Sequence, residues 1–237
     1  MELYNKITPC PIIDALFEIR FENKIPDNAI FGIIYSEFKN SYPRQEGLPI
    51  LQIPEEFRKK DSALRYCPHY RFLNDNFILQ VGPSVLSISS YPKYVGWNNF
   101  KPELLNCIEH IKKLEIIKTI ERLGLRYIDS FDFPILEYTN YNVHLPDINL
   151  EEKNTFIKTE FSNGLINNLL RIGNDAIVLD DNKRQSTIDI DTSLIDKNSL
   201  NNFFENVSFT LDKMHDSCKS LFFTVLNEKI KEKLEFS

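Results

Sequence analysis

The chain has 237 residues, of which 42% are hydrophobic and 26% charged, which is typical of a soluble globular protein and excludes a disordered one. Its net charge of −6 and pI near 5.4 leave no basic excess to displace counterions from a phosphate backbone, so general nucleic-acid binding is disfavoured. No apolar run reaches the roughly 18 residues of a membrane helix, and the N-terminal residues lack a signal-peptide pattern. We therefore expect a cytoplasmic protein with no membrane association and with four free cysteines.

The first elements follow clear periodicities. Alternation over residues 11–22 predicts a half-buried strand, with Phe17, Ile19 and Phe21 on its apolar face. A helix is then expected from about Asp27 to Tyr42, because apolar residues recur at helical spacing and a proline follows.

Residues 44–62 are polar and contain several prolines, so we expect a connection with at most a short strand at 49–53. A connection of this length is uncommon in a compact domain unless it is mobile or functional. Strands are predicted at about 66–74 and 77–91, with a bulge near Gly82 in the second.

A helix is expected at about 98–114, capped by Asn98 or Asn99, and a long apolar strand at 116–133. Trp97, just before this helix, is either a hydrophobic contact that fixes the start of the helix or an exposed binding anchor. The first half of the chain thus has the pattern β-α-β-β-α-β.

The second half is expected to hold several strands and one long helix. The strands lie at about 156–161, 166–172, 176–180 and 186–194, with turns at 173–175 and 181–183, and the helix spans about 199–234, capped by Asn198 or Ser199. The sequence predicts an α+β fold with one or more antiparallel-rich sheets in two similar halves, about 1–133 and 134–237. A single compact domain is expected, with the C-terminal helix packed on the sheet.

Arginines on predicted strands are the most prominent polar set. Arg122 and Arg126 share one strand face about 13 Å apart, too far to grip one carboxylate but suited to pairing across neighbouring strands. Together with Arg20 and Arg71 on other predicted strands they could bind a phosphate, a carboxylate or an acidic partner. We favour the structural interpretation, in which Glu18, Glu22 and Glu121 neutralise these arginines across neighbouring strands.

Other chemical signatures are weak. Asp189 and Asp191 point to one strand face, as a divalent ion would need, but a solvated strand has the same pattern. His215 follows Asp212 on a helix and could act in acid–base chemistry or simply form a local hydrogen bond. The four histidines, His144 included, lack zinc spacing, and nucleophile and phosphate-loop motifs are absent, so no cofactor is expected.

Five short segments carry a resemblance that spans most of the chain: Ala15–Phe21, Tyr94–Trp97 with Phe100, Ile188–Asp191, Leu211–His215 and, most specific, the Arg-Leu-Gly-Leu-Arg-Tyr-Ile run of residues 122–128. In these the chain resembles a sporadically distributed family of uncharacterised prokaryotic proteins of about this size. The resemblance implies no activity, cofactor or catalytic residue. The patchy distribution is similar to that of accessory genes, including antiphage-defence and toxin–antitoxin components.

Three functions are compatible with these features. The first is a non-enzymatic interaction or regulatory module that binds a protein partner, either the product of a neighbouring gene or a second copy of the chain. The second is an enzyme or a sensor of a small phosphate- or carboxylate-bearing ligand that uses the arginines with Asp191 and His215. The third, a nucleic-acid-binding accessory protein, is disfavoured by the acidic charge.

Overall fold

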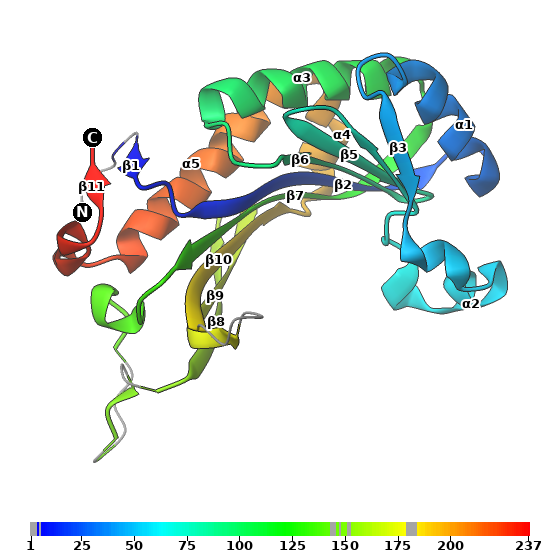
Figure 1. Cartoon of the computed structure of the whole chain (residues 1–237). Coiled ribbons are helices and arrows are strands. Elements are labelled where there is room, and N and C mark those ends of the chain that lie inside the picture. Colours follow the sequence, from blue (N-terminus) through cyan, green and yellow to red (C-terminus); the bar gives the residue numbers. More distant parts are fainter. Residues whose placement is uncertain (1–3, 5, 143–145, 147, 151–152, 179–183) are drawn as a thin grey trace. The chain divides into compact units, whose positions relative to one another are not determined.

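The computed structural model describes residues 4, 6–142, 146, 148–150, 153–178 and 184–237 (Figure 1). The protein has the predicted α+β fold, with an antiparallel sheet and a C-terminal helix. Its contacts form two compact units: unit 1 comprises residues 1–15, 125–193 and 212–237, and unit 2 comprises residues 16–124 and 194–211. No helix in the described part of the chain is long and apolar enough to cross a membrane.

Unit 2 is built on antiparallel strands with short connections. Their hydrogen-bonded order is β3 (Arg44–Gly47), β4 (Tyr70–Leu73), β5 (Phe77–Gly82), β6 (Val85–Ser90), β2 (Ile12–Asn23) and β7 (Ile117–Phe131). Both β2 and β7 contribute residues to each unit. The register pairs Tyr70 with Val81 and Val85 with both Gly82 and Arg20, so the start of β4, the β5–β6 turn and the end of β2 share one end of the sheet.

Two helices cover one face of these strands, α1 (Asp27–Phe38) and α3 (Trp97–Lys113), as Figure 1 shows. The predicted apolar positions form the core: Phe17, Ile19 and Phe21 of β2 are at most 1% exposed. The helices contribute their own buried stripes (Ile30, Ile34 and Phe38 from α1; Phe100, Leu104, Ile108 and Ile111 from α3). Removing this apolar surface from water is the main stabilising contribution to the unit.

Several local predictions for unit 2 were wrong. The strand expected at 77–91 is a hairpin of β5 and β6, because the chain turns at Pro83. Gly82, the last residue of β5, lies close to the neighbouring backbone: a Cβ there would be 2.6 Å from the carbonyl oxygen of Cys67. The short strand expected at 49–53 is the 3-10 helix η1 (Pro49–Gln52), followed by α2 (Glu55–Lys60) and η2 (Ser62–Leu64). Helix α3 is preceded by Gly96 at φ 84°, a conformation that favours glycine over the predicted asparagine caps.

Unit 1 continues β7 with β10 (Arg184–Leu194), β9 (Ile166–Val178) and β8 (Thr155–Asn163), in that order. Helix α5 (Val207–Val225) buries Leu211 at the margin of unit 2, and Met214, Cys218 and Phe222 within unit 1. The unit also holds η3 (Leu136–Tyr138), η6 (Glu228–Glu232) and a two-strand pair of β1 (Ile7–Thr8) with β11 (Glu235–Phe236). All four cysteines are free thiols, as expected.

The predicted C-terminal helix is shorter than expected. Residues 199–234 form α4 (Lys197–Asn201), η5 (Phe203–Glu205), α5 and η6 rather than one helix. Asp196, not Asn198 or Ser199, caps α4 by accepting from the backbone N–H of Ser199. After α5, Leu226 forms a β-bridge with Thr139, and Asn227 caps η6, so tertiary contacts override the helical periodicity.

The predicted turn at 173–175 is also wrong. Strand β9 runs through it, with Gly173 paired to Phe156 and Asp175 at φ 49°. The buried side chain of Asn174 donates to the carbonyl of Lys153 and accepts from the backbone of Leu136, and these contacts hold the segment within the sheet. The other predicted turn, at 181–183, lies outside the described residues.

Candidate functional site: a cationic pocket in unit 2

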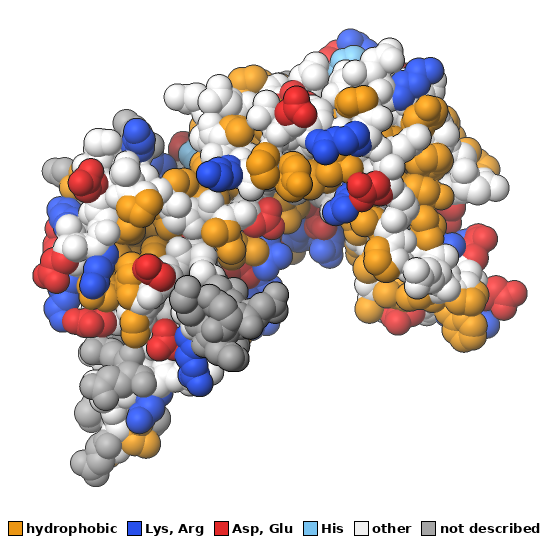
Figure 2. Space-filling view, in the orientation of Figure 1, with side chains coloured by type: hydrophobic (Ala, Val, Ile, Leu, Met, Phe, Trp, Pro, Cys, Tyr) orange, Lys and Arg blue, Asp and Glu red, His pale blue; other side chains and the backbone are white. Residues whose placement is uncertain are grey.

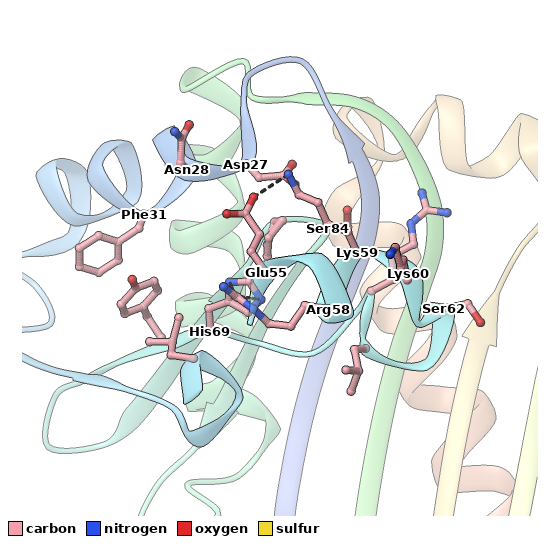
Figure 3. A pocket seen from close by; sticks show the side chains of 15 residues that line it. Asp27, Asn28, Phe31, Glu55, Arg58, Lys59, Lys60, Ser62, His69 and Ser84 are labelled. Atoms are coloured by element: carbon pink, nitrogen blue, oxygen red, sulfur yellow. Dashed lines mark hydrogen bonds and ion pairs between the residues drawn. The ribbon is translucent and has the colours of Figure 1, made fainter. Parts of the chain in front are cut away.

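A pocket of about 530 Å³ opens at the end of the unit 2 sheet where β4 starts and β5 turns into β6 (Figure 3). This volume is typical of sites for small organic ligands. The antiparallel register brings the pieces together, because the first turn of α1 follows β2 at the same end of the sheet. The lining comprises Asp27, Asn28, Phe31, Leu51, Glu55, Arg58, Lys59, Lys60, Ser62, Leu64, Arg65, His69, Tyr70, Pro83 and Ser84.

Helix α2 supplies most of the positive charge. It follows Pro54, has glutamates in its first turn and has Arg58, Lys59 and Lys60 in its last. This arrangement of charges favours a helix even in a short segment, because it complements the backbone dipole. Lys59 is paired with Glu55 at 2.6 Å, as the dashed line in Figure 3 shows.

The central contact of the pocket joins Arg58 to His69, which lie side by side in Figure 3. Nη1 of Arg58 is 3.1 Å from both ring nitrogens of His69. Burial, and then the positive charge of Arg58, lower the pKa of His69, so the imidazole is neutral at pH 7. Arg58 is thus held by a neutral ring, and it forms no salt bridge among the described residues.

A second donor of Arg58 lacks an acceptor. Its Nε is buried and has no hydrogen-bond partner in the described part of the chain. An unsatisfied charged donor costs on the order of 1–3 kcal/mol or more, so such groups usually have a partner. Nε is closed to solvent in this structure, so it is an energetic cost at the pocket wall and not itself a contact open to a ligand.

The remaining cations differ in how far they are neutralised. Arg65 donates to Glu121 at 2.8 Å. Lys60 is exposed and forms no ion pair with any described residue. Because Lys59 and Arg65 have carboxylate partners, Arg58 and Lys60 are the two cations with charge available to a ligand.

The other side of the pocket is apolar and aromatic. Phe31 of α1 stacks on Tyr70 of β4, with ring centroids 3.9 Å apart. Leu51 and Leu64 also line the cavity. A ligand that fits would therefore combine an anionic group with an apolar or aromatic body.

None of the predicted site residues lines this pocket. In unit 2, Arg20 donates from Nε to Glu18 at 2.6 Å and lies 4.8 Å above the ring of Tyr66. Arg122 donates to the same carboxylate at 3.0 Å. Glu18 thus bridges two of the predicted arginines. Its contact with Arg122 is the cross-strand pairing expected from the sequence, whereas Arg20 lies two residues away on the same strand, β2.

In unit 1, Arg126 donates from Nε and Nη2 to the two carboxylate oxygens of Asp189, each at 2.8 Å. Arg171 donates to the same carboxylate at 2.9 Å. The hydrogen bonds that Arg126 donates to Asp189 are the main cause of the raised pKa of Arg126, and the charges of Asp189, Asp191 and Asp14 add to it. The carboxylate of Asp189 therefore binds arginine rather than a metal, and the described residues contain no group of three metal-ligating side chains.

The two remaining candidates have structural contacts. Nδ1 of His215 lies 3.1 Å from the hydroxyl of Tyr127. Trp97 is the first residue of α3, and its ring meets that of Phe100 edge-on at 6.3 Å. This contact is the one expected of a residue that fixes the start of the helix. His144 lies outside the described residues.

The surface charge is mixed. Figure 2 shows Lys and Arg side chains interspersed with Asp and Glu over the face that it draws. No basic strip is visible there, in line with the acidic composition.

Sequence reasoning missed the pocket because its residues come from four separate segments. The usable signal was the unusual length of the connection at 44–62, which contains α2 and its cations. Arg58 and His69 are eleven positions apart, so no periodicity joins them. In comparisons with known proteins, no protein-family model and no curated protein matches this chain.

Proposed function

We propose that this chain is a non-enzymatic binding module for a small molecule that carries a phosphate or carboxylate group on an apolar body. The observation that carries the proposal is the state of Arg58, which lines the pocket, is held by a neutral imidazole and forms no salt bridge among the described residues. A guanidinium presents its donors in a planar fork that matches the oxygens of a carboxylate or phosphate.

The other walls fit the same class of ligand. Lys60 would add a second positive charge, and the stacked Phe31 and Tyr70 would contact a flat or apolar body. A regulatory role suits this site better than catalysis. Among the lining residues, His69 is the one whose ordinary pKa suits proton transfer at neutral pH. Both of its ring nitrogens contact Arg58, so neither faces a ligand as a general acid or base would.

Isothermal titration calorimetry of the full chain tests the proposal with four probes: adenosine 5′-monophosphate, adenosine, inorganic phosphate and phenylacetate. We expect the probes with both an anionic group and an apolar body to bind more tightly than adenosine or phosphate alone. Binding should weaken as the salt concentration rises, because part of it is electrostatic.

Two variants make the test specific to the pocket. R58A should weaken binding by about tenfold or more, the usual effect of losing a charged hydrogen bond. K39A removes an exposed charge at the end of α1 and outside the pocket, so it should leave the affinity unchanged. Equal effects of the two variants, or no saturable binding of any anionic probe, would show that the proposal is wrong.

A further inference from the structure

Strand β8 (Thr155–Asn163) ends the strand order of unit 1 and pairs with β9. Within the described residues no strand pairs with its outer edge. The outer edge of this nine-residue strand presents unpaired N–H and C=O groups at alternate residues, a ready template for another strand, and proteins usually protect such edges with prolines, bulges or several charges. The sequence of β8, TFIKTEFSN, has neither proline nor glycine and only one lysine and one glutamate.

We propose that two copies of this chain associate by antiparallel pairing of β8 with β8, centred on Thr159. Such a pair is related by a two-fold axis, so each contact occurs twice. The pairing places Lys158 of one copy opposite Glu160 of the other, and the reverse. The charges therefore match only when the strand meets itself in this register.

The apolar residues match in the same register. Ile157 would lie opposite Phe161 of the second copy, on the same sheet face as Thr159. Phe161 is 41% exposed in the single chain, so pairing would bury apolar surface. Aromatic and β-branched side chains directly opposite each other are favourable cross-strand neighbours.

Lys158 and Glu160 can form ion pairs with a second copy of the chain because both side chains are exposed. Lys158 and Glu160 are 56% and 73% exposed and form a 3.5 Å ion pair along their own strand. Their Cβ atoms are about 6–7 Å apart as same-face neighbours on one strand, but residues directly opposite on paired strands have Cβ atoms about 4.5–5.5 Å apart. In the dimer, two contacts across strands would replace the two solvated contacts along strands, one from each copy, and would join side chains whose Cβ atoms are closer.

A second copy fits this edge better than a different protein does. A strand from a different protein would need charges complementary to those of β8, but such a pairing would not require the sequence of β8 to be complementary to itself. The five residues Ile157–Phe161 are arranged symmetrically about Thr159 in apolar and charged character, which makes this segment complementary to itself in a two-fold pair; Phe156 would lie opposite Ser162.

Sedimentation velocity of the full chain over a range of micromolar concentrations tests the proposal. The unmodified chain should dimerise reversibly. K158E would place glutamates opposite glutamates, and E160K lysines opposite lysines, so each variant alone should dimerise at least about tenfold more weakly. An equimolar mixture of the two variants restores both opposite-charge pairs and should dimerise again, as should the double variant K158E/E160K.

Controls separate this interface from general charge effects and from misfolding. K213E reverses an exposed charge on α5 and should dimerise like the unmodified chain. Circular dichroism should show that all variants fold, since the substituted side chains of β8, Lys158 and Glu160, are exposed. A monomeric unmodified chain, or a dimer that survives in both K158E and E160K, would overturn the proposal.

The register has its own test. T159C should link two chains by a disulfide under mild oxidation, because the central residue faces its own counterpart. I157C should not link to itself, since its counterpart is opposite position 161. Equal cross-linking of the two variants would rule out the register centred on Thr159.

Discussion

The guanidinium of Arg126 binds the carboxylate of Asp189 with two parallel hydrogen bonds of 2.8 Å, and Arg171 donates a third to the same carboxylate. The side chain of Asp189 is 10% exposed, so this group lies mostly out of water. Asp189 thus compensates two arginines from neighbouring strands of unit 1, and its role is structural.

Replacing Asp189 by alanine should destabilise the protein strongly. D189A would leave Arg126 and Arg171 without their shared acceptor, a loss that typically costs about 3–5 kcal/mol for buried charges. We expect about 2–4 kcal/mol here, because the two arginines are partly exposed. Urea unfolding measures the change, and the exposed acidic residue Glu56 provides the control variant E56A; similar losses in the two variants would contradict the structural role.

The glycine of the central Arg-Leu-Gly-Leu-Arg run has a steric role. A Cβ on Gly124 would lie 2.3 Å from Nη1 of Arg122, whose guanidinium passes over this position to reach Glu18. G124A should therefore cost about 1 kcal/mol, because Arg122 must move and its hydrogen bond weakens. In an R122A background the same substitution should cost nothing, or should stabilise, since alanine suits a strand better than glycine. A double-mutant cycle by urea unfolding checks the coupling, and an equal cost of G124A in both backgrounds would disprove it.

His69 should make stability depend on pH on the acidic side of neutrality. Its folded-state pKa is lowered below the ordinary value near 6.5, by burial first and then by Arg58. Between the folded-state pKa of His69 and about pH 6.5, the unfolded chain binds a proton that the folded chain does not, so stability is lost as the pH falls below about 6.5. Unfolding free energies at pH 7.5 and 5.5 should differ more for the unmodified chain than for H69Q. An unchanged difference in H69Q would assign the effect to another group.

Asp129 should produce the opposite dependence. Its carboxyl is 3% exposed, and burial, with a smaller contribution from the charge of Asp189, raises its pKa to about 8. The folded chain then retains a proton that the unfolded chain releases near pH 4, so stability is lost as pH rises from about 4 to about 8.

The variant D129N removes this ionisation and should be more stable than the unmodified chain at pH 8, by on the order of a few kcal/mol. Near pH 4 the two proteins should differ little. Urea unfolding at both pH values measures the effect, and a constant difference across this range would show that Asp129 does not titrate as inferred.

Short-range patterns in the sequence predicted most of the secondary structure. The alternation of β2 and the helical spacing of α1 and α3 identified residues that the structure buries, such as Phe17, Ile34 and Leu104. Patterns failed where a distant contact decided the outcome. Asn174 looks like a turn residue, but its side chain bonds to Leu136 and Lys153, and these partners keep β9 continuous.

The candidate site was the least predictable part. Arg20, Arg122 and Arg126 were visible as a group because strand periodicity places them on predictable faces. The partners of Arg122 and Arg126, Glu18 and Asp189, lie on adjacent strands, and Glu18 also pairs with Arg20 on its own strand. The binding set around Arg58 has no such periodicity. It exists because the antiparallel register brings the end of β2, the start of β4 and the β5–β6 turn to one end of the sheet.

The sequence by itself determined the α+β class, the buried faces of the main elements and the acidic character of the chain, since these depend on composition and on periods of two or 3.6 residues. It also determined the symmetry of Ile157–Phe161 about Thr159, which is a property of five consecutive residues. Only the tertiary structure decided which arginines are neutralised and which retain charge for a ligand. Hydrogen bonds and burial depend on distances between atoms that are remote in the chain, and for Arg58 those distances place a neutral histidine where Arg126 has a carboxylate.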